Sequence, residues 1–213
     1  VHLVRIGNKG AIVGGIKDTV IVVILVAKVT LAVAIGVHQG RTIRTRSEAS
    51  IVAEAKEFTT YKDFKGIISD VGGPTANMYG YECKKKLKLG TCDHQRCVDS
   101  RHLCSSMRVD HSRVINMMKQ VREVPGVKKA FVASGIRYDL INEDPKHGYS
   151  YLKELVRHHI SGQMKVAPEH TQQHVLDLMG KPGKQTLIDF KKLYDKLNRE
   201  EGKKQFLTYY LIA

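Results

Sequence analysis

Residues 66–79, GIISDVGGPTANMY, join a short apolar segment to a polar, glycine-rich turn. Ile67 and Ile68 form the apolar part, and a glycine pair follows a few residues later. A short apolar segment that ends in such a turn is typical of a buried parallel strand. Because ligands of α/β proteins bind at the carboxyl ends of their strands, this turn is the first candidate for a functional site.

Outward from this segment, helix and strand patterns alternate over residues 46–213. Apolar residues recur at helical spacing in residues 46–58, 110–124, 149–160, 170–180 and 184–202. Short apolar segments predict strands over residues 64–73, 126–135, 162–168 and 203–213. Ser47 is expected to cap the first helix, and Asp110 or Ser112 the second. Gly180 is expected to end the fourth helix.

Strands that alternate with helices predict an α/β fold with a parallel sheet. Right-handed crossovers leave two architectures, an open doubly wound sheet or a (β/α) barrel. Three predicted strand ends read SDVGGPTANMY, ASGIRYD and VAPEHT. Since the carboxyl ends of parallel strands meet at one edge, three such loops indicate a ligand site rather than ordinary turns. We expect one domain over residues 1–213, with a cysteine-rich insertion at about 82–110.

The chain is strongly basic, with 35 lysines and arginines against 21 acidic residues and a net charge of +14. Such a field attracts phosphates, nucleic acid or an anionic membrane surface, and a merely solvated basic surface is the alternative. No RNA-binding motif is visible in the sequence. Nucleic acid is therefore a candidate partner on charge alone.

Residues 19–37 form the longest apolar segment and approach the roughly 20 residues that a membrane-spanning helix needs. Lys28 at its centre would cost about 2.5–3.5 kcal/mol on insertion. The valines and isoleucines of the segment also suit buried strands. We therefore favour no membrane span and expect a cytoplasmic protein. The chain begins without Met and ends inside an apolar segment, as expected of a fragment of a longer protein.

All four cysteines lie between positions 83 and 104, spaced C-x8-C-x4-C-x6-C. Clustered thiols in a reducing compartment more often bind metal or perform redox chemistry than form disulfides. The tight C-x2-C pair of many zinc sites is absent, so zinc, an iron–sulfur centre, unligated thiols and a disulfide all stay open. Basic neighbours would favour thiolates, and His94, His102 or His111 could replace one sulfur. The predicted ligands are Cys83, Cys92, Cys97 and Cys104.

Other chemistry in the sequence is weaker. The pair Gly72 and Gly73 is not part of a phosphate-binding signature. His158 and His159 end a predicted helix, where a positive charge is favourable, so helix capping is their simplest interpretation. A serine hydrolase is disfavoured, since no partner histidine can be assigned to Ser134 from the sequence.

Several segments resemble the YgiQ-type family of radical S-adenosylmethionine (SAM) proteins. The resemblance covers residues 38–213 and begins at VHQGRTIRTRSEASIVAEAKEF. Its most specific parts are SDVGGPTANMYG and KVAPEHT with VLDLMGKP. Members of this family are larger proteins with the radical SAM barrel in their second half, which fits the expected fragment.

The resemblance implies a partial (β/α) barrel of the radical SAM type, with parallel strands and outer helices. It also implies a [4Fe–4S] cluster, held by three cysteines, whose fourth iron binds SAM. One electron from a reductant would cleave SAM to a 5′-deoxyadenosyl radical, which takes hydrogen from an unknown substrate. By the same resemblance, the residues expected along SAM are Gly72, Gly73, Pro74, Ser134, Arg137 and Glu169.

The sequence departs from this family just before residue 38, where the family carries C-x3-C-x2-C after its first strand. Counting back places those cysteines at Val26, Thr30 and Val33, none of which can bind iron. The first strand is expected at residues 17–24. Two explanations stay open: the chain is a homologue without radical chemistry, or residues 1–37 misreport the natural protein.

Three functions follow from these observations. The leading one is a radical SAM iron–sulfur enzyme domain. The second is a non-catalytic metal-binding module held by the cysteines, with zinc or an iron–sulfur centre. The third is an RNA-associated protein that lacks the SAM-cleaving cluster.

Overall fold

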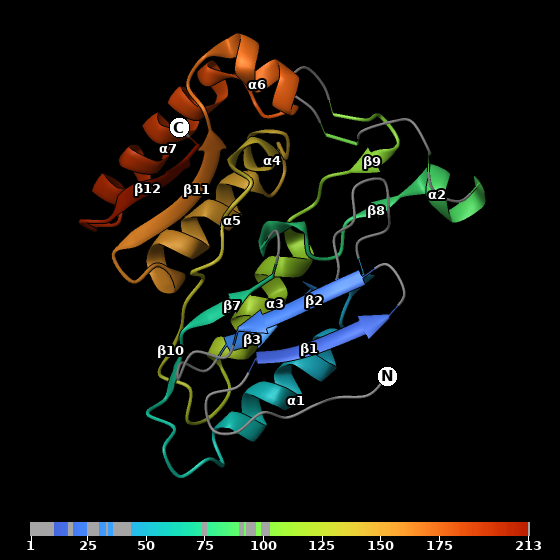
Figure 1. Ribbon diagram of the computed structural model, residues 1–213. Coiled ribbons are helices and arrows are strands. Elements are labelled where there is room, and N and C mark those ends of the chain that lie inside the picture. Colours follow the sequence, from blue (N-terminus) through green and yellow to red (C-terminus); the bar gives the residue numbers. More distant parts are fainter. Residues whose placement is uncertain are drawn as a thin grey trace.

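A computed structural model of the 213-residue chain is shown in Figure 1. For residues before 45 it describes the backbone alone. The residues it describes are 11–16, 19–24, 30–32, 34–35, 44–73, 76–89, 92, 97–98 and 103–212.

The architecture is mixed α/β, and each described sheet has two strands. Parallel pairing joins strands that are distant in sequence, as a crossover through helices requires. The parallel pairs are β3 (Thr30–Ala32) with β7 (Asp70–Gly72), β6 (Ile67–Ile68) with β10 (Lys129–Ala130), and β11 (Gln163–Glu169) with β12 (Phe206–Leu211).

Single contacts join these parallel pairs in the order of the chain. The Val71 N–H donates to the Phe131 carbonyl at 2.6 Å, which links β7 to the segment after β10. Ile136 then forms a parallel bridge with Val166 of β11. Successive strands of the chain are thus neighbours, which confirms the prediction of an α/β fold with parallel strands. The described strands form no closed barrel, and the partial barrel stays a prediction.

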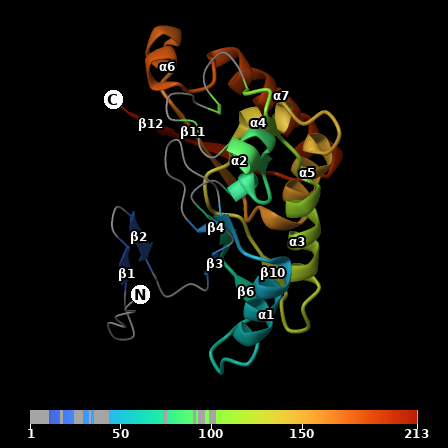
Figure 2. The ribbon, with the colours of Figure 1, turned by 90° about the vertical axis from the view of Figure 1, so that its right-hand side faces the viewer.

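The antiparallel pairs are all local. They are β1 (Ala11–Ile16) with β2 (Thr19–Ile24), β4 (Ala34–Ile35) with β5 (Arg44–Thr45), and β8 (Glu82–Cys83) with β9 (Met107–Arg108). In Figure 2 the β1–β2 hairpin lies on one side of the parallel strands and helices α1 (Glu48–Phe58), α3 (Ser112–Arg122) and α5 (Gly148–Glu154) lie on the other.

The prediction that residues 17–24 form the first parallel strand is wrong. Thr19–Ile24 pairs instead with Ala11–Ile16, because only a two-residue connection separates these apolar segments and a hairpin closes locally. The parallel partner of β7 is β3, with Thr30 opposite Asp70 and Ala32 opposite Gly72. Within the described ranges, none of the helices has the length and apolar character needed to cross a membrane.

The remaining helices include α4 (Tyr138–Asn142), α6 (Gln173–Met179) and α7 (Lys184–Glu200). Apolar residues from the helices and the parallel strands meet in one buried core. Fully buried members include Ile51 of α1, Met117 and Met118 of α3, and Phe190 and Tyr194 of α7. Short helical turns complete the elements: η1 (Ala76–Met78), α2 (Lys84–Leu89) and η2 (Leu155–His159).

The helix boundaries confirm most of the predicted caps. The Ser47 hydroxyl accepts a hydrogen bond from the Ser50 N–H at 3.2 Å, and Gly180 ends α6 with a left-handed φ of 65°. The N-cap of α3 is instead His111, which makes no side-chain cap, although the Asp110 carboxylate before it accepts from the Ser112 N–H at 2.9 Å. The capping interpretation of His159 is wrong, because its ring is fully buried and its Nδ1 lies 2.6 Å from the Ala130 carbonyl oxygen.

Candidate functional site

Two of the predicted strand-end loops are joined by Asp70 of β7. Its carboxylate accepts hydrogen bonds from the Ala133 N–H at 2.8 Å and from the Ser134 N–H at 3.1 Å. Its other oxygen accepts from the Ser134 hydroxyl at 2.5 Å. Because a charged acceptor strengthens hydrogen bonds, these contacts fix the loop of residues 134–137 against the end of β7.

Gly72 lies directly beneath the same contact and is buried. A Cβ atom at this position would lie 2.3 Å from the Ser134 hydroxyl oxygen and 2.7 Å from an Asp70 carboxylate oxygen. Gly72 is therefore required for the close approach of the two loops. Gly73 is half-buried beside it, and Pro74 lies outside the described residues.

Asn77 of η1 makes a second link between these loops. Its side-chain oxygen accepts from the Arg137 N–H and its amide nitrogen donates to the Arg137 carbonyl, both at 2.9 Å. The Arg137 guanidinium is itself paired with Asp139, through bonds of 2.9 and 2.5 Å. Asn77 thus fixes the backbone of Arg137, and Asp139 orients its side chain.

A fully buried histidine supports Asn77 from behind. His111 Nε2 lies 3.2 Å from the Asn77 amide nitrogen and 2.9 Å from the Tyr81 hydroxyl. Its Nδ1 lies 2.8 Å from Asp144, which also accepts from the His111 N–H at 2.8 Å. The ring of Tyr151 stacks on the imidazole with centroids 4.6 Å apart. These contacts fit a neutral imidazole that donates from Nδ1 and accepts at Nε2.

The pair of His111 and Asp144 makes stability depend on pH. Burial lowers the pKa of His111 despite the opposing effect of Asp144. Burial acts to raise the pKa of Asp144, but hydrogen bonds from the His111 and His147 N–H groups lower it overall. Both groups therefore bind protons more readily in the unfolded chain, so stability must fall as the pH falls.

We expect the free energy of unfolding to fall below about pH 6.5, the ordinary pKa of histidine, by up to about 1.4 kcal/mol per pH unit for His111. A further loss follows as the pH falls from about 3.9 through the lowered pKa of Asp144. Urea unfolding between pH 8 and pH 5 measures the first slope, with His111→Gln as the comparison. An equal slope in the variant would contradict this origin.

Glu169 marks the third strand end. Among the residues that the structure describes, it alone combines a side chain with a positive φ, at 69°. Its carboxylate pairs with Lys181 at 3.1 Å, and its carbonyl accepts from the Ile212 N–H at 2.8 Å. A left-handed non-glycine residue costs free energy and is most often found at functional sites. The left-handed backbone at Glu169 therefore turns its side chain in a direction that a residue of an extended strand does not take.

The three strand ends thus lie on neighbouring strands and share one edge of the parallel array. The sequence identified Gly72, Ser134, Arg137 and Glu169, and the first three are brought into one contact network. Reasoning from the sequence missed Asp70, Asn77 and Asp144, and it named His111 only as a possible metal ligand. Asp70 and Asn77 lie within residues 66–79, where their polar side chains were the signal that could have marked them as site residues. Asp144 has no local signal, because its partner His111 is 33 residues away.

The positions expected to hold an iron–sulfur cluster do not fit it. Val26 and Val33 lie outside the described residues, and neither residue type has a side chain that binds iron. Thr30 is a strand residue of β3 paired with Asp70, and it does not follow the strand as the cluster motif would. The printed chain therefore offers no thiolate at these positions.

The four cysteines are all free thiols. Burial and the neighbouring thiols of Cys104, Cys83 and Cys92 raise the pKa of Cys97, which is opposite to the shift expected from basic neighbours. In the described part of the chain, no group of three or more His, Cys, Asp or Glu side chains is arranged to hold a metal ion as it stands. His111 is not a spare ligand, because Asp144 and Tyr81 occupy its ring nitrogens. His94 and His102 lie outside the described residues.

These features define an α/β protein with parallel strands and a polar site at their carboxyl ends. Its sequence is similar to proteins named UPF0313. It is 57% identical over 180 residues to a UPF0313 protein of Fusobacterium nucleatum, covering 84% of this chain and 32% of that protein. UPF0313 proteins of Clostridium perfringens strain SM101 and Clostridium botulinum strain Okra are 50% and 46% identical over the same length, which is 27% and 28% of those proteins.

The chain thus spans about a third or less of the length of these curated relatives. No family model matches the sequence. No solved structure matches it.

Proposed function

We propose that this chain is the SAM-binding part of a radical SAM-type enzyme and that SAM binds at the carboxyl ends of β7, β10 and β11. The observation that carries the proposal is the link between the strand-end loops made by Asp70, Ser134, Asn77 and Arg137. The order of parallel neighbours along the chain and the family resemblance of these same loops support it. Such an edge is where α/β folds bind ligands.

The residues of the edge have separable roles in this proposal. Gly72 lets the two loops close, and Asp70 and Asn77 fix them before the ligand arrives. Preorganised loops lower the entropic cost of binding. Glu169 presents an acceptor for a hydroxyl or an amine, paired until then with Lys181. The edge thus binds and orients a polar, partly charged nucleoside.

The cluster that supplies SAM cleavage in the resembled family lacks its ligands in the printed chain, so we derive no reaction step through it. Whether the natural protein cleaves SAM depends on the residues at positions 26, 30 and 33. An intact-mass measurement decides first whether the printed residues 1–37 are those of the protein.

Anaerobic reconstitution with iron and sulfide then tests the chemistry. A brown protein that cleaves SAM to 5′-deoxyadenosine, with a mass that differs from the printed sequence, supports the enzyme and places the discrepancy in the sequence. A mass equal to the printed sequence, together with colourless protein and intact SAM, contradicts radical chemistry for this chain.

A further inference from the structure

One face of the β11–β12 pair is open to solvent along β12. Met164 and Val166 of β11 are fully buried, and Leu207 of β12 packs partly against the same core. Because side chains alternate along a strand, the residues between them project to the opposite face. On that face Phe206 and Tyr210 of β12 are 61% and 49% exposed. Two large aromatic rings thus stand in water on one sheet face, which marks it as a candidate binding surface.

Polar side chains separate these two rings. Thr208 lies between them on β12, directly opposite Lys165 of β11. Gln163 stands opposite Phe206, and its side-chain oxygen accepts a hydrogen bond from the Thr208 hydroxyl at 2.9 Å, so both strands contribute to this face. At about 3.3 Å per residue, four residues place the rings about 13 Å apart. An apolar protein segment laid across the face would leave its polar groups without partners, so the face does not suit one.

The surroundings of this face are basic. Exposed Lys203 and Lys204 just precede β12. The only acidic residue of the two strands, Glu169, lies at the far end of β11 and is paired with a lysine at 3.1 Å. The whole chain carries a net charge of +14, so its field favours a polyanion at this face.

We propose that this open face of β11 and β12 binds single-stranded RNA. Phe206 and Tyr210 stack on two bases, since proteins that bind single strands combine exposed aromatic rings with basic neighbours. The nearby lysines neutralise phosphates. The side-chain amide of Gln163, beside the rings, can bond the 2′-hydroxyl that DNA lacks. A duplex keeps its bases stacked on each other, so it cannot use the rings in this way.

Fluorescence anisotropy of a labelled RNA of about 12 unpaired nucleotides tests the face in the absence of SAM, so the result is independent of the proposed function. We expect saturable binding that weakens about 20-fold between about 50 and about 200 mM salt, as neutralisation of about three phosphates requires. Phe206→Ala and Tyr210→Ala should each weaken binding at least about fivefold, through the loss of one stacked base.

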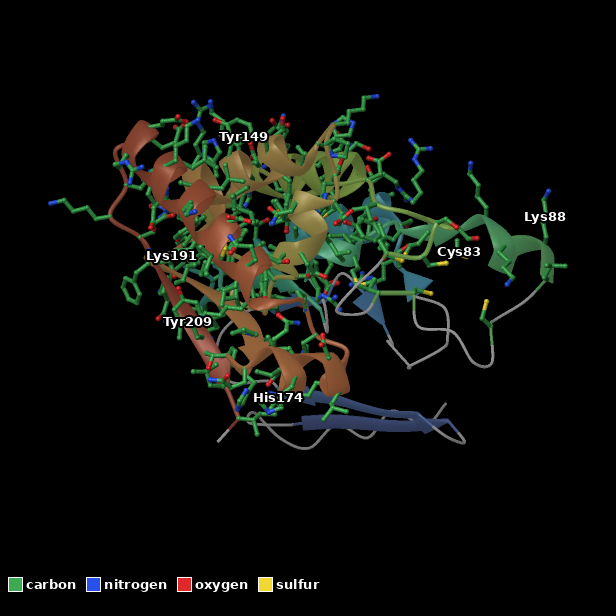
Figure 3. All side chains as sticks on the ribbon, turned by 90° about the horizontal axis from the view of Figure 1, so that it is seen from above. Cys83, Lys88, Tyr149, His174, Lys191 and Tyr209 are labelled. Atoms are coloured by element: carbon green, nitrogen blue, oxygen red, sulfur yellow. The ribbon has the colours of Figure 1, made fainter. Side chains whose placement is uncertain are left out.

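Tyr149→Ala and Lys88→Ala are the matched controls. Each removes an exposed residue of the same chemistry, the first from α5 and the second from α2. Figure 3 shows both residues well apart from Tyr209, which marks β12. Both variants should bind the RNA as the wild-type chain does.

Photocrosslinking of the unaltered chain guards against variants that merely unfold. Ultraviolet crosslinks to the RNA should map to residues 203–212 by mass spectrometry. Crosslinks confined to other segments, or no saturable RNA binding at about 50 mM salt, would overturn the proposal. Equal affinity for a DNA strand or a duplex would overturn the assignment to single-stranded RNA. A dimer that Phe206→Ala dissociates, without RNA binding, would assign the face to a second copy of the chain instead.

Discussion

Replacing Asp144 with alanine is expected to lower the free energy of unfolding by at least about 3 kcal/mol, because each buried donor left without an acceptor costs about 1–3 kcal/mol. The Asp144 side chain is 3% exposed, and one of its oxygens accepts from both the N–H and the Nδ1 of His111. The other oxygen accepts from the N–H groups of Lys146 and His147, just before α5. Alanine would remove the acceptor of all four donors, and the two on His111 are fully buried.

Urea unfolding at pH 7 measures this effect, and Asp144→Asn is the matched variant. Asparagine keeps an acceptor for Lys146 and His147 but turns an N–H group or a neutral oxygen toward His111. The free energy of unfolding of Asp144→Asn should therefore lie between those of the wild-type chain and Asp144→Ala. If Asp144→Ala lowers the free energy of unfolding by less than about 1 kcal/mol, the contact between Asp144 and His111 does not stabilise the segments that precede α3 and α5.

Replacing Gly72 with alanine is the second large effect, because it acts on the proposed binding edge itself. The new Cβ would lie 2.3 Å from the Ser134 hydroxyl oxygen and 2.8 Å from its Cβ. Relief requires the Ser134 loop to move away from β7, which breaks its bonds to Asp70. Overpacking of this kind costs about 1–3 kcal/mol of stability. The shifted loop should also weaken SAM binding at least about tenfold, or about 1.4 kcal/mol.

Gly135→Ala is the matched control for stability. No atom lies within 4 Å of a Cβ built on Gly135, so Gly135→Ala is expected to leave the stability of the chain unchanged. The double variant Gly72→Ala with Ser134→Gly removes the clashing side chain and should recover part of the stability lost. Thermal unfolding of the three variants measures these differences. Equal stability of Gly72→Ala and the wild-type chain would contradict the close contact between the loops.

Local patterns in the sequence predicted the elements that depend on neighbouring residues. Ile67 and Ile68 predicted the strand β6, of which only Ile68 is buried while Ile67 is 47% exposed. Ser47 predicted the start of α1, and Gly180 the end of α6. Each of these signals acts within a few residues, through periodicity or a cap. The loops of the site were predicted for the same reason, since strand ends in parallel sheets meet at one edge.

The missed features depend on contacts between distant residues. Asp144 supports α3 from 33 positions away, and Asn77 binds the backbone of a residue 60 positions away. No spacing rule connects such partners. The apolar residues 19–24 had an unpredicted partner as well, because pairing with residues 11–16 left the place beside β7 to Thr30–Ala32. The role of Asp70 as the link between loops also becomes visible only once Ser134 stands beside it.

The central claim is that the edge formed by β7, β10 and β11 binds SAM. Equilibrium dialysis of the full chain against labelled SAM tests it most directly, with Lys192→Ala on the exposed face of α7 as the control. We predict saturable binding of one SAM per chain, displaced by unlabelled SAM, unchanged in Lys192→Ala and at least about tenfold weaker in Gly72→Ala. Absence of saturable SAM binding by the folded wild-type chain would contradict the account.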